Sequence, residues 1–293
     1  DLVGGLKGGI INFVVKHIKK MVQPFHIPGT VSFKDAIREG RNLIFTPVET
    51  VAEDIAFLQY TGGTTGVSKA AVLKHKNILA NVEQISAWMI PRIEDRLEIV
   101  VTPLPLYHIF ALTVNCFAFF NKGAKNILIT DPRNIPEFVK ELKRRKFTAM
   151  TGVNTLFNAL ANNKDFKAAK IPGLKIVVAG GMAVQKAVAE RWLNVTGVPI
   201  CEGYGLTEAS PVLTCNPIDG TDRVGTIGLP LPSTGIRIID DDGNELETGK
   251  AGEILAKGPQ VMDCYWNKPE ETALVLNNGW LKTGDIGFMD EDG

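Results

Sequence analysis

The sequence predicts an α/β fold with a largely parallel sheet covered by helices, followed by a small β-rich, barrel-like subdomain. Between about residues 54 and 205, short apolar segments alternate with segments of helical spacing, which is typical of parallel sheets with helical connections. After about residue 224, Gly, Pro and Asp turns become frequent and the expected elements are short strands. We therefore expect an N-terminal helical or irregular segment over 1–53, an α/β subdomain over 54–223 and a β-rich subdomain over 224–293.

The N-terminal segment contains one amphipathic stretch, Ile10–Val22. Its apolar face consists of Ile11, Val14, Val15, Ile18 and Val22, opposite Lys16, Lys19 and Lys20. A basic helix of this kind either packs on a core as an ordinary surface helix or lies on an anionic membrane. Both alternatives stay open at this point.

The α/β part is read from short apolar runs and from the helical spacing between them. The expected strands are Ile55–Tyr60 (a buried strand), Ala70–His75, Glu98–Val101, Asn126–Ile129, Thr148–Met150 and Leu174–Ala179. The expected helices are Asn77–Met89, Ile135–Arg145, Asn154–Asn162 and Val184–Val195. Ligands of such sheets bind at the carboxyl ends of the strands. In the β-rich part, Asp240–Asn244 is a hairpin signal.

Composition excludes several classes of protein. The 32 basic and 32 acidic residues give no net charge, which argues against a nucleic-acid-binding protein. Four cysteines without CxxC spacing indicate isolated thiols in a reducing cytoplasm rather than a metal site or disulfides. No apolar run approaches the roughly 18 residues of a membrane span. The absence of an initiator Met and the final turn signal Asp290–Gly293 lead us to expect a piece of a longer protein.

The most informative stretch is Tyr60–Ala70. Its glycines can turn backbone N–H groups inward, its hydroxyls add donors and Lys69 adds a positive charge, which together suit a polyphosphate. It is not a Walker A motif, because Lys69 stands three residues after Gly66 and Ala70 replaces the magnesium-binding hydroxyl. A second strand is expected next, so we predict a hairpin loop with a lysine at its exit. The alternative is a flexible surface turn.

Three further motifs follow in order: Ala179-Gly-Gly-Met182, Glu202-Gly-Tyr-Gly-Leu-Thr-Glu208 and Thr283-Gly-Asp285. With the Tyr60–Ala70 loop, they resemble the AMP-forming acyl-CoA synthetase superfamily, also called adenylate-forming enzymes. Within that group, the chain is most similar to the bacterial long-chain-fatty-acid–CoA ligases. The stretches that carry this likeness are Phe57–Gly66, Pro103–Leu112, Thr151–Leu160 and Lys257–Met262.

The resemblance implies an acetyl-CoA synthetase-like fold and a reaction of fatty acid, ATP and CoA, with Mg²⁺ as cofactor. It implies that Lys69, Thr207 and Glu208 are catalytic: Lys69 with its loop holds the β- and γ-phosphates, Thr207 hydrogen-bonds the α-phosphate and Glu208 binds the metal. The implied nucleotide-binding residues are Tyr60, Thr61, Gly62, Gly63, Thr64, Thr65, Gly66, Ser68, Lys69, Gly180, Gly181, Gly203, Tyr204, Gly205, Thr207 and Asp285. Tyr204 would stack on adenine and Asp285 would bind both ribose hydroxyls. His108, Gly181 and Met182 are the implied acyl-site residues.

Each of these residues also has a purely structural alternative. Glu208 could be a helix-start acid, Asp285 a turn cap, and Tyr204 and His108 core side chains. Trp88, Trp192 and Trp266 are predicted to be core rather than acyl pocket. The loop departs from the family at Ser68 and Ala70, where relatives commonly have Pro and Gly, yet the lysine charge is kept.

The resemblance further implies segments outside this sequence. The family's basic linker motif would follow Gly293, and beyond it a C-terminal domain carries the adenylation lysine and rotates between the two half-reactions. We expect the chain alone to be catalytically incompetent. The rival hypotheses are an adenylate-forming ligase for a medium-chain, aromatic or amino acid, an ATP-binding kinase or phosphatase that yields ADP, and a non-catalytic module. Peripheral contact of this cytoplasmic protein with the inner membrane and a homodimer also stay open.

Overall fold

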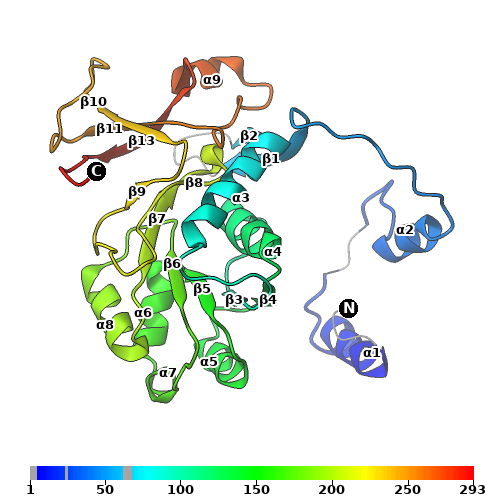
Figure 1. Ribbon diagram of the computed structural model, residues 1–293. Coiled ribbons are helices and arrows are strands. Elements are labelled where there is room, and N and C mark those ends of the chain that lie inside the picture. Colours follow the sequence, from blue (N-terminus) through cyan, green and yellow to red (C-terminus); the bar gives the residue numbers. More distant parts are fainter. Residues whose placement is uncertain (1–4, 24–25, 62–67) are drawn as a thin grey trace. The chain divides into compact units, whose positions relative to one another are not determined.

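The computed structural model describes residues 5–23, 26–61 and 68–293 (Figure 1). The chain divides into two compact units, Asp1–Glu49 and Thr50–Gly293. The helices are α1 (Gly5–Phe13), α2 (Phe33–Gly40), α3 (His75–Met89), α4 (Phe119–Asn121), α5 (Ile135–Arg144), α6 (Asn154–Asn162), α7 (Lys164–Ala168), α8 (Lys186–Thr196) and α9 (Pro269–Val275). Two π-helical segments, η1 (Val14–Ile18) and η2 (Ala111–Ala118), and a 3₁₀ turn, η3 (Thr207–Ala209), complete the helical structure of the described residues.

The strands of the described residues form three sheets. They are β1 (Ile55–Thr61), β2 (Lys69–Lys74), β3 (Ile99–Thr102), β4 (Lys125–Leu128), β5 (Ala149–Gly152), β6 (Ile176–Ala179), β7 (Cys201–Gly205), β8 (Val212–Cys215), β9 (Leu229–Pro230), β10 (Gly235–Ile239), β11 (Gly252–Lys257), β12 (Leu276–Asn277) and β13 (Trp280–Gly287). Each strand and helix expected between residues 54 and 205 has a counterpart within a few residues of its predicted bounds.

The first unit is helical. The amphipathic helix expected over 10–22 lies in α1, which begins at Gly5, and in the π-helical segment that follows it, η1. Most of its apolar side chains are exposed, with Gly8 the buried residue of α1. In residues 5–23, 26–61 and 68–293, no helix combines the length and the apolar character that a membrane crossing requires.

The main sheet of the second unit has seven strands in the order β4-β3-β5-β6-β7-β8-β9. The pairs from β4 to β7 are parallel and the last two pairs are antiparallel, so the prediction of a largely parallel sheet is confirmed. Successive residues face opposite sides: Val100 joins one core cluster and Val101 the other. Helices cover both faces, which explains why the central strands are apolar throughout (Figure 1).

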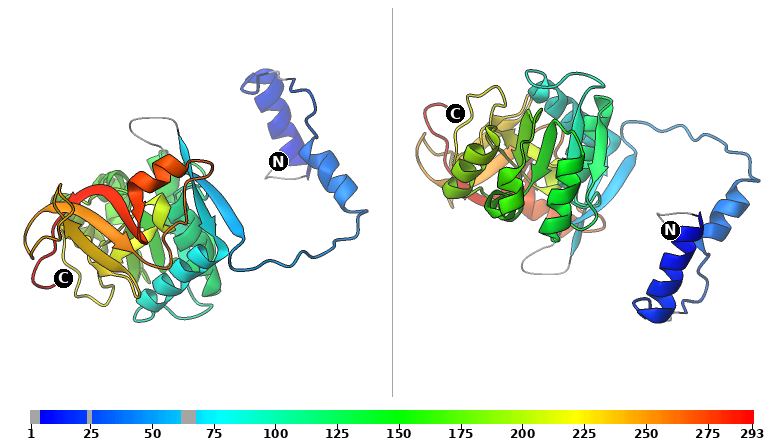
Figure 2. Two further views of the ribbon diagram at one scale, coloured as in Figure 1. Left: turned by 90° about the horizontal axis from the view of Figure 1, so that it is seen from above. Right: turned by 90° about the horizontal axis from the view of Figure 1, so that it is seen from below.

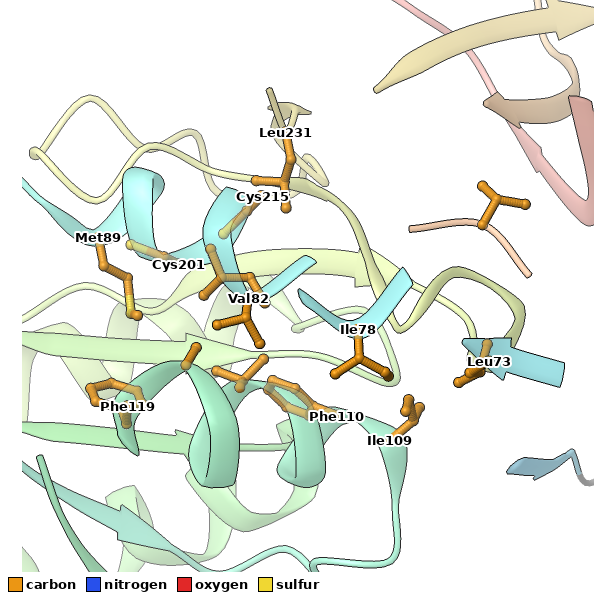
Figure 3. Close-up of a cluster of buried hydrophobic side chains, with 14 of the residues drawn as sticks. Leu73, Ile78, Val82, Met89, Ile109, Phe110, Phe119, Cys201, Cys215 and Leu231 are labelled. Carbon is orange, nitrogen blue, oxygen red and sulfur yellow. The ribbon is translucent and has the colours of Figure 1, made fainter. Parts of the chain in front are cut away.

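Two hydrophobic cores therefore flank the sheet. One lies between the sheet, α3 and η2, and contains Val82, Phe110 and Phe119 (Figure 3). The other lies under α5, α6 and α8, with Trp192 fully buried between Phe157 and Phe166. Glu98, just before β3, is a buried carboxylate. Desolvation alone would raise its pKa, but hydrogen bonds and the ion pair with Lys175 have the larger combined effect. The pKa of Glu98 is therefore lowered.

The β-rich part contains an antiparallel sheet in the order β10-β11-β13-β12. A separate hairpin, β1–β2, stands beside α9 in the view from above (Figure 2). It confirms the predicted hairpin with Lys69 at its exit, since Thr61 pairs with Lys69 across the loop. The prediction that Ile55–Tyr60 is buried is wrong: Tyr60 is 63% exposed, because β1 pairs only with β2 in this sheet. The subdomain boundary at residue 224 stays a prediction.

Candidate active site

A cavity of about 470 Å³ opens at the carboxyl ends of β6 and β7. Parallel strands direct their following loops to this edge, which is where the sequence predicts ligand binding. Its polar wall comes from the hairpin, the loops after β6 and β7, and the β-rich part: Thr61, Lys69, Gly180, Gly181, Gly203, Tyr204, Gly205, Thr207, Glu208, Tyr265 and Thr283. The volume falls within the roughly 300–1,000 Å³ common for small-molecule sites.

One end of the cavity is built around Tyr204 on β7. Its hydroxyl donates a hydrogen bond of 2.6 Å to Asp285 Oδ2, which joins positions 81 residues apart. Burial, and then the bond to Asp285, raise the pKa of Tyr204 well above its usual value of 10. The phenol is therefore a proton donor at neutral pH. Asp285 is exposed on β13, and its backbone N–H donates to Thr283 Oγ1 at 3.1 Å.

The other end is built around Glu208, in the 3₁₀ turn that follows β7. The half-buried Glu208 accepts a hydrogen bond of 2.6 Å from the Tyr265 hydroxyl at Oε1. Its backbone carbonyl accepts from the Met262 N–H at 2.7 Å. Lys69 Nζ lies 4.8 Å from the centre of the Tyr265 ring and 3.4 Å from Glu271 Oε2. A cation and a carboxylate thus contact one tyrosine, the cation at the ring face and the carboxylate at the hydroxyl.

Glu208 fits the requirements of a magnesium ion. Mg²⁺ is usually held by one or two carboxylates together with substrate phosphates, and it keeps several waters. The half-buried carboxylate lines the cavity, with the Thr207 residue beside it. Within the described ranges, no three His, Cys, Asp or Glu side chains gather as a cation site. A single carboxylate on the cavity wall is the donor set that such an ion needs when substrate phosphates supply further ligands.

Two glycines are needed for the shape of this wall. Gly181 has a φ of +80°, a conformation that side chains with a Cβ rarely adopt. A Cβ on Gly205 would lie 1.9 Å from the Pro211 carbonyl oxygen, so β7 and the start of β8 could not approach as they do. Met182, the next residue after Gly181, is exposed and lies outside the cavity lining.

His108 lies on the rim of the cavity. Its Nδ1 accepts a hydrogen bond of 3.3 Å from the Phe110 N–H. Although the residue as a whole is exposed, the cavity wall desolvates part of the ring and lowers the pKa of the imidazole below its usual 6.5. The side chain is consequently neutral at pH 7, and the alternative of a core histidine is wrong.

Beyond His108 the lining becomes apolar. It consists of Ile85, Trp88, Met89, Ile109, Phe110, Val114, Cys215, Ile218 and Leu231, several of which are drawn in Figure 3. Trp88 was predicted to be core, but it lines the cavity and donates from Nε1 to the Asn216 carbonyl at 3.0 Å. Trp266 is also not core, with 44% of its surface exposed. Trp192 is the tryptophan for which the core prediction is confirmed.

The structure brings most of the predicted site residues together. Those that line the cavity are Thr61, Lys69, His108, Gly180, Gly181, Gly203, Tyr204, Gly205, Thr207 and Glu208. Asp285 reaches it through Tyr204, whereas Tyr60, Ser68 and Met182 lie outside the lining. Gly62, Gly63, Thr64, Thr65 and Gly66 lie outside the described residues. Ser68 Oγ donates a hydrogen bond of 2.8 Å to the Thr61 carbonyl.

Sequence reasoning missed Tyr265, Glu271 and Glu202. Tyr265 and Glu271 stand in no motif, and only the fold brings them to Glu208 and Lys69. Glu202 could have been found, because it opens the motif that ends at Glu208. It is buried and accepts from the N–H groups of Val184 at 2.8 Å and Gly225 at 3.2 Å. Glu202 therefore holds the loops beside β7 rather than facing a ligand.

Comparison with known proteins gives the following matches. The profile described as "AMP-binding enzyme" matches residues 16–266. A long-chain-fatty-acid–CoA ligase of Salmonella typhimurium is 54% identical over 293 residues, which is 100% of this chain and 52% of that protein. The chain thus spans about half the length of the curated relatives it matches.

Solved structures resemble the chain over most of its length. ATP-bound MatB from Rhodopseudomonas palustris is 31% identical with a TM-score of 0.75, over 85% of this chain and 49% of that chain. The anthranilate CoA ligase AuaEII, in complex with anthranoyl-AMP, is 25% identical with a TM-score of 0.82, over 92% of this chain and 52% of that chain. Both likenesses agree with the architecture of sheet, helices and β-rich part.

Proposed function

Since the chain belongs to the AMP-binding enzyme family, we propose that the whole protein activates a long-chain fatty acid with ATP and transfers it to CoA. In the first step the acid's carboxylate attacks the α-phosphorus, forming acyl-adenylate and releasing pyrophosphate. In the second step the CoA thiol displaces AMP, giving acyl-CoA. The identity of 54% to a long-chain-fatty-acid–CoA ligase supports this substrate class over the other acids that the superfamily takes.

The observation that carries the proposal is that one cavity has both a polar and an apolar part. Tyr204, Glu208 and Lys69 line the polar part. Trp88, Met89 and Leu231 line the apolar part, which suits an alkyl chain because burying each CH₂ contributes about 0.8 kcal/mol. A carboxylate between these two parts would stand next to the nucleotide phosphates with its chain in the apolar part.

We assign the adenosine to the end built around Tyr204. The ring of Tyr204 stacks on adenine, and Asp285 accepts hydrogen bonds from both ribose hydroxyls. The bond of 2.6 Å between the Tyr204 hydroxyl and Asp285 supports this assignment, because it fixes the carboxylate beside the cavity. Gly180 and Gly181 let the backbone approach the nucleotide.

We assign the triphosphate to the end built around Glu208. Lys69, with Thr61, Ser68 and the rest of its loop, holds the β- and γ-phosphates, and Thr207 donates to the α-phosphate. Glu208 would hold Mg²⁺, which would supply charge neutralisation for the attack of one anion on another. Both partners of the first step are negative, so positioning and neutralisation must supply most of the rate gain.

The acyl carboxylate then lies near His108 and Gly181. A neutral His108, supported by its lowered pKa, can donate to or accept from a carboxylate or thiol without adding charge. Met182 is exposed and next to Gly181, where it could contact CoA or the acyl chain only at the entrance. We further propose a cytoplasmic location, since the four cysteines are free thiols.

Product analysis on the whole protein tests this function. Acid-dependent exchange of pyrophosphate into ATP, measured with long-chain, medium-chain and aromatic acids, is expected to be fastest with a long chain. AMP and pyrophosphate are the expected products, with acyl-CoA when CoA is added. Formation of ADP would favour a kinase, a preference for an aromatic acid would change the substrate class, and no turnover would favour a non-catalytic module.

A further inference from the structure

We propose that Tyr265 is a positioning residue for the end of the cavity built around Glu208. Its hydroxyl orients the Glu208 carboxylate, and its ring holds the Lys69 ammonium in place. This inference rests on the proposed function, which makes Glu208 the metal-binding carboxylate and Lys69 the phosphate-binding cation. Tyr265 contacts both groups, at 2.6 Å from Glu208 Oε1 and with its ring centre 4.8 Å from Lys69 Nζ. It stands outside the four motifs that carry the family resemblance.

Tyr265 is held firmly enough to orient its neighbours. The side chain is 5% exposed, and its backbone forms an antiparallel bridge with Ala71 on β2. The flanking residues extend this pairing: the Val72 N–H donates to the Cys264 carbonyl at 2.9 Å and the Trp266 N–H to the Ala70 carbonyl at 2.8 Å. The segment is therefore joined by an isolated bridge to β2, the strand that begins at Lys69.

A second attachment fixes the direction of the segment. The Tyr265 N–H donates to Thr272 Oγ1 on α9 at 3.0 Å. Three residues before Tyr265, the Met262 N–H donates to the backbone carbonyl of Glu208 at 2.7 Å. The hairpin, α9 and the turn that carries Glu208 thus meet at one short segment, and Tyr265 is the side chain that this segment directs to both charged groups.

The hydroxyl acts on the Glu208 carboxylate. A hydrogen bond to one carboxylate oxygen fixes the rotation of the group and leaves its other oxygen available. A donor–acceptor distance of 2.6 Å indicates a charge-assisted bond, which is stronger than a neutral one. A tyrosine hydroxyl carries its proton at neutral pH, so the donor is kept. Groups that orient metal ligands in this way contribute about 10- to 100-fold to metal affinity or activity.

The ring acts on Lys69. An ammonium within about 6 Å of an aromatic ring centre is attracted to the ring face, typically by 0.5–1 kcal/mol at exposed sites. Phenylalanine would supply a similar ring and would fill the same space. A role in packing alone, therefore, does not require the hydroxyl, whereas orientation of Glu208 does.

The test measures ATP binding by calorimetry to the whole protein, with saturating Mg²⁺ and with EDTA. Tyr265→Phe is expected to reduce the affinity gained from Mg²⁺ by about 10- to 100-fold. In EDTA its ATP affinity should stay within about twofold of the parent, because the ring beside Lys69 is kept. Tyr265→Leu should in addition weaken binding in EDTA by about two- to fivefold. Tyr107→Phe, the same change on a tyrosine that is 79% exposed, is the matched control and should alter neither value.

A double-mutant cycle separates orientation from general destabilisation. In a Glu208→Gln background, Tyr265→Phe should have no further effect on the Mg²⁺-dependent affinity, since the carboxylate it orients is gone. Additive losses, or an unchanged Mg²⁺ dependence in Tyr265→Phe, would overturn the inference. If the parent protein binds no ATP at all, the proposed function fails. If Mg²⁺ increases the ATP affinity of the parent and of Tyr265→Phe by the same factor, only the role of Tyr265 fails.

Discussion

The Tyr204 end and the Glu208 end of the cavity contain the same kind of hydrogen bond in different surroundings. At each end a tyrosine hydroxyl donates a hydrogen bond of 2.6 Å to a carboxylate: Tyr204 to Asp285, and Tyr265 to Glu208. Burial raises the pKa of both tyrosines. Asp285 is exposed, and no ion pair reaches it within the described residues. Glu208 is half-buried, and Lys69 lies over the ring of the same Tyr265 that donates to Glu208.

The difference matches what each end has to bind. Ribose hydroxyls are neutral donors, so a carboxylate with two acceptor oxygens suffices and no cation is needed. A triphosphate is strongly anionic, so that end needs a lysine and a metal-binding carboxylate. Changes at the Tyr204 end should therefore affect adenosine, AMP and ATP alike, whereas changes at the Glu208 end should affect only ligands with further phosphates.

The largest expected effect comes from Glu208→Gln. The amide keeps the shape but removes the charge that holds Mg²⁺, and metal neutralisation contributes several kcal/mol to such reactions. We expect pyrophosphate exchange by the whole protein to fall by at least about 100-fold. Adenosine affinity, measured by calorimetry, should be unchanged. Equal losses in exchange and in adenosine binding would contradict the separation between the two ends.

Asp285→Ala should give the next largest effect. Loss of the acceptor for both ribose hydroxyls costs on the order of 1–3 kcal/mol, or roughly tenfold to a hundredfold in affinity. The loss should be the same for adenosine, AMP and ATP, because all three carry the ribose. Calorimetric dissociation constants for the three ligands check this. An unchanged constant for adenosine would remove Asp285 from the site.

A smaller effect is expected from Tyr204→Phe. The ring that stacks on adenine is kept, while Asp285 loses the donor that orients it. A single hydrogen bond contributes about 0.5–1.5 kcal/mol, so affinity for AMP should fall by about two- to tenfold. The same loss should appear with Mg²⁺ and with EDTA, in contrast to Tyr265→Phe. A loss confined to Mg²⁺-containing solutions would mean that the two tyrosines are not assigned to separate ends.

The fold was largely predictable because its signals are local. Val100 and Val101 face opposite cores, so the run of apolar residues in β3 identifies a strand covered on both faces. The π-helix η2, Ala111–Ala118, was not predicted. Within it the buried Asn115 donates to Thr102 Oγ1 at 3.0 Å and accepts from Thr151 Oγ1 at 3.0 Å. Those partners lie on two different strands, and spacing within the helix does not reveal them.

The site residues also differ in whether a local sequence signal identifies them. Lys69 stands in a loop whose composition suits a polyphosphate, and Thr207 and Glu208 stand in a motif that the family resemblance singles out. The structure places all three on one cavity. Tyr265 is 57 positions from Glu208, and its role depends on a bridge to Ala71 that only the folded chain forms. Trp88 was assigned to the core because an apolar helical position looks the same whether it faces a packed neighbour or a cavity wall.

Glu271→Gln is expected to have the smallest effect, and it is the variant expected to increase the affinity for ATP. Glu271 on α9 pairs with Lys69 at 3.4 Å, so the triphosphate must replace this carboxylate to reach the lysine. Both side chains are partly exposed, and such pairs contribute about 0.2–1 kcal/mol. Removing the charge should therefore tighten ATP binding by about one and a half- to fivefold at low salt, with little change near 1 M salt.

AMP affinity provides the internal comparison for Glu271→Gln, because AMP lacks the phosphates that Lys69 contacts and should bind as to the parent. Glu270→Gln is the matched control: it removes the same charge from the adjacent position of α9. If both variants tighten ATP binding equally, the effect is a general change of net charge near the cavity. If Glu271→Gln alone does so, and only for ATP, the ion pair with Lys69 is a specific competitor of the triphosphate, as the contrast between the two ends requires.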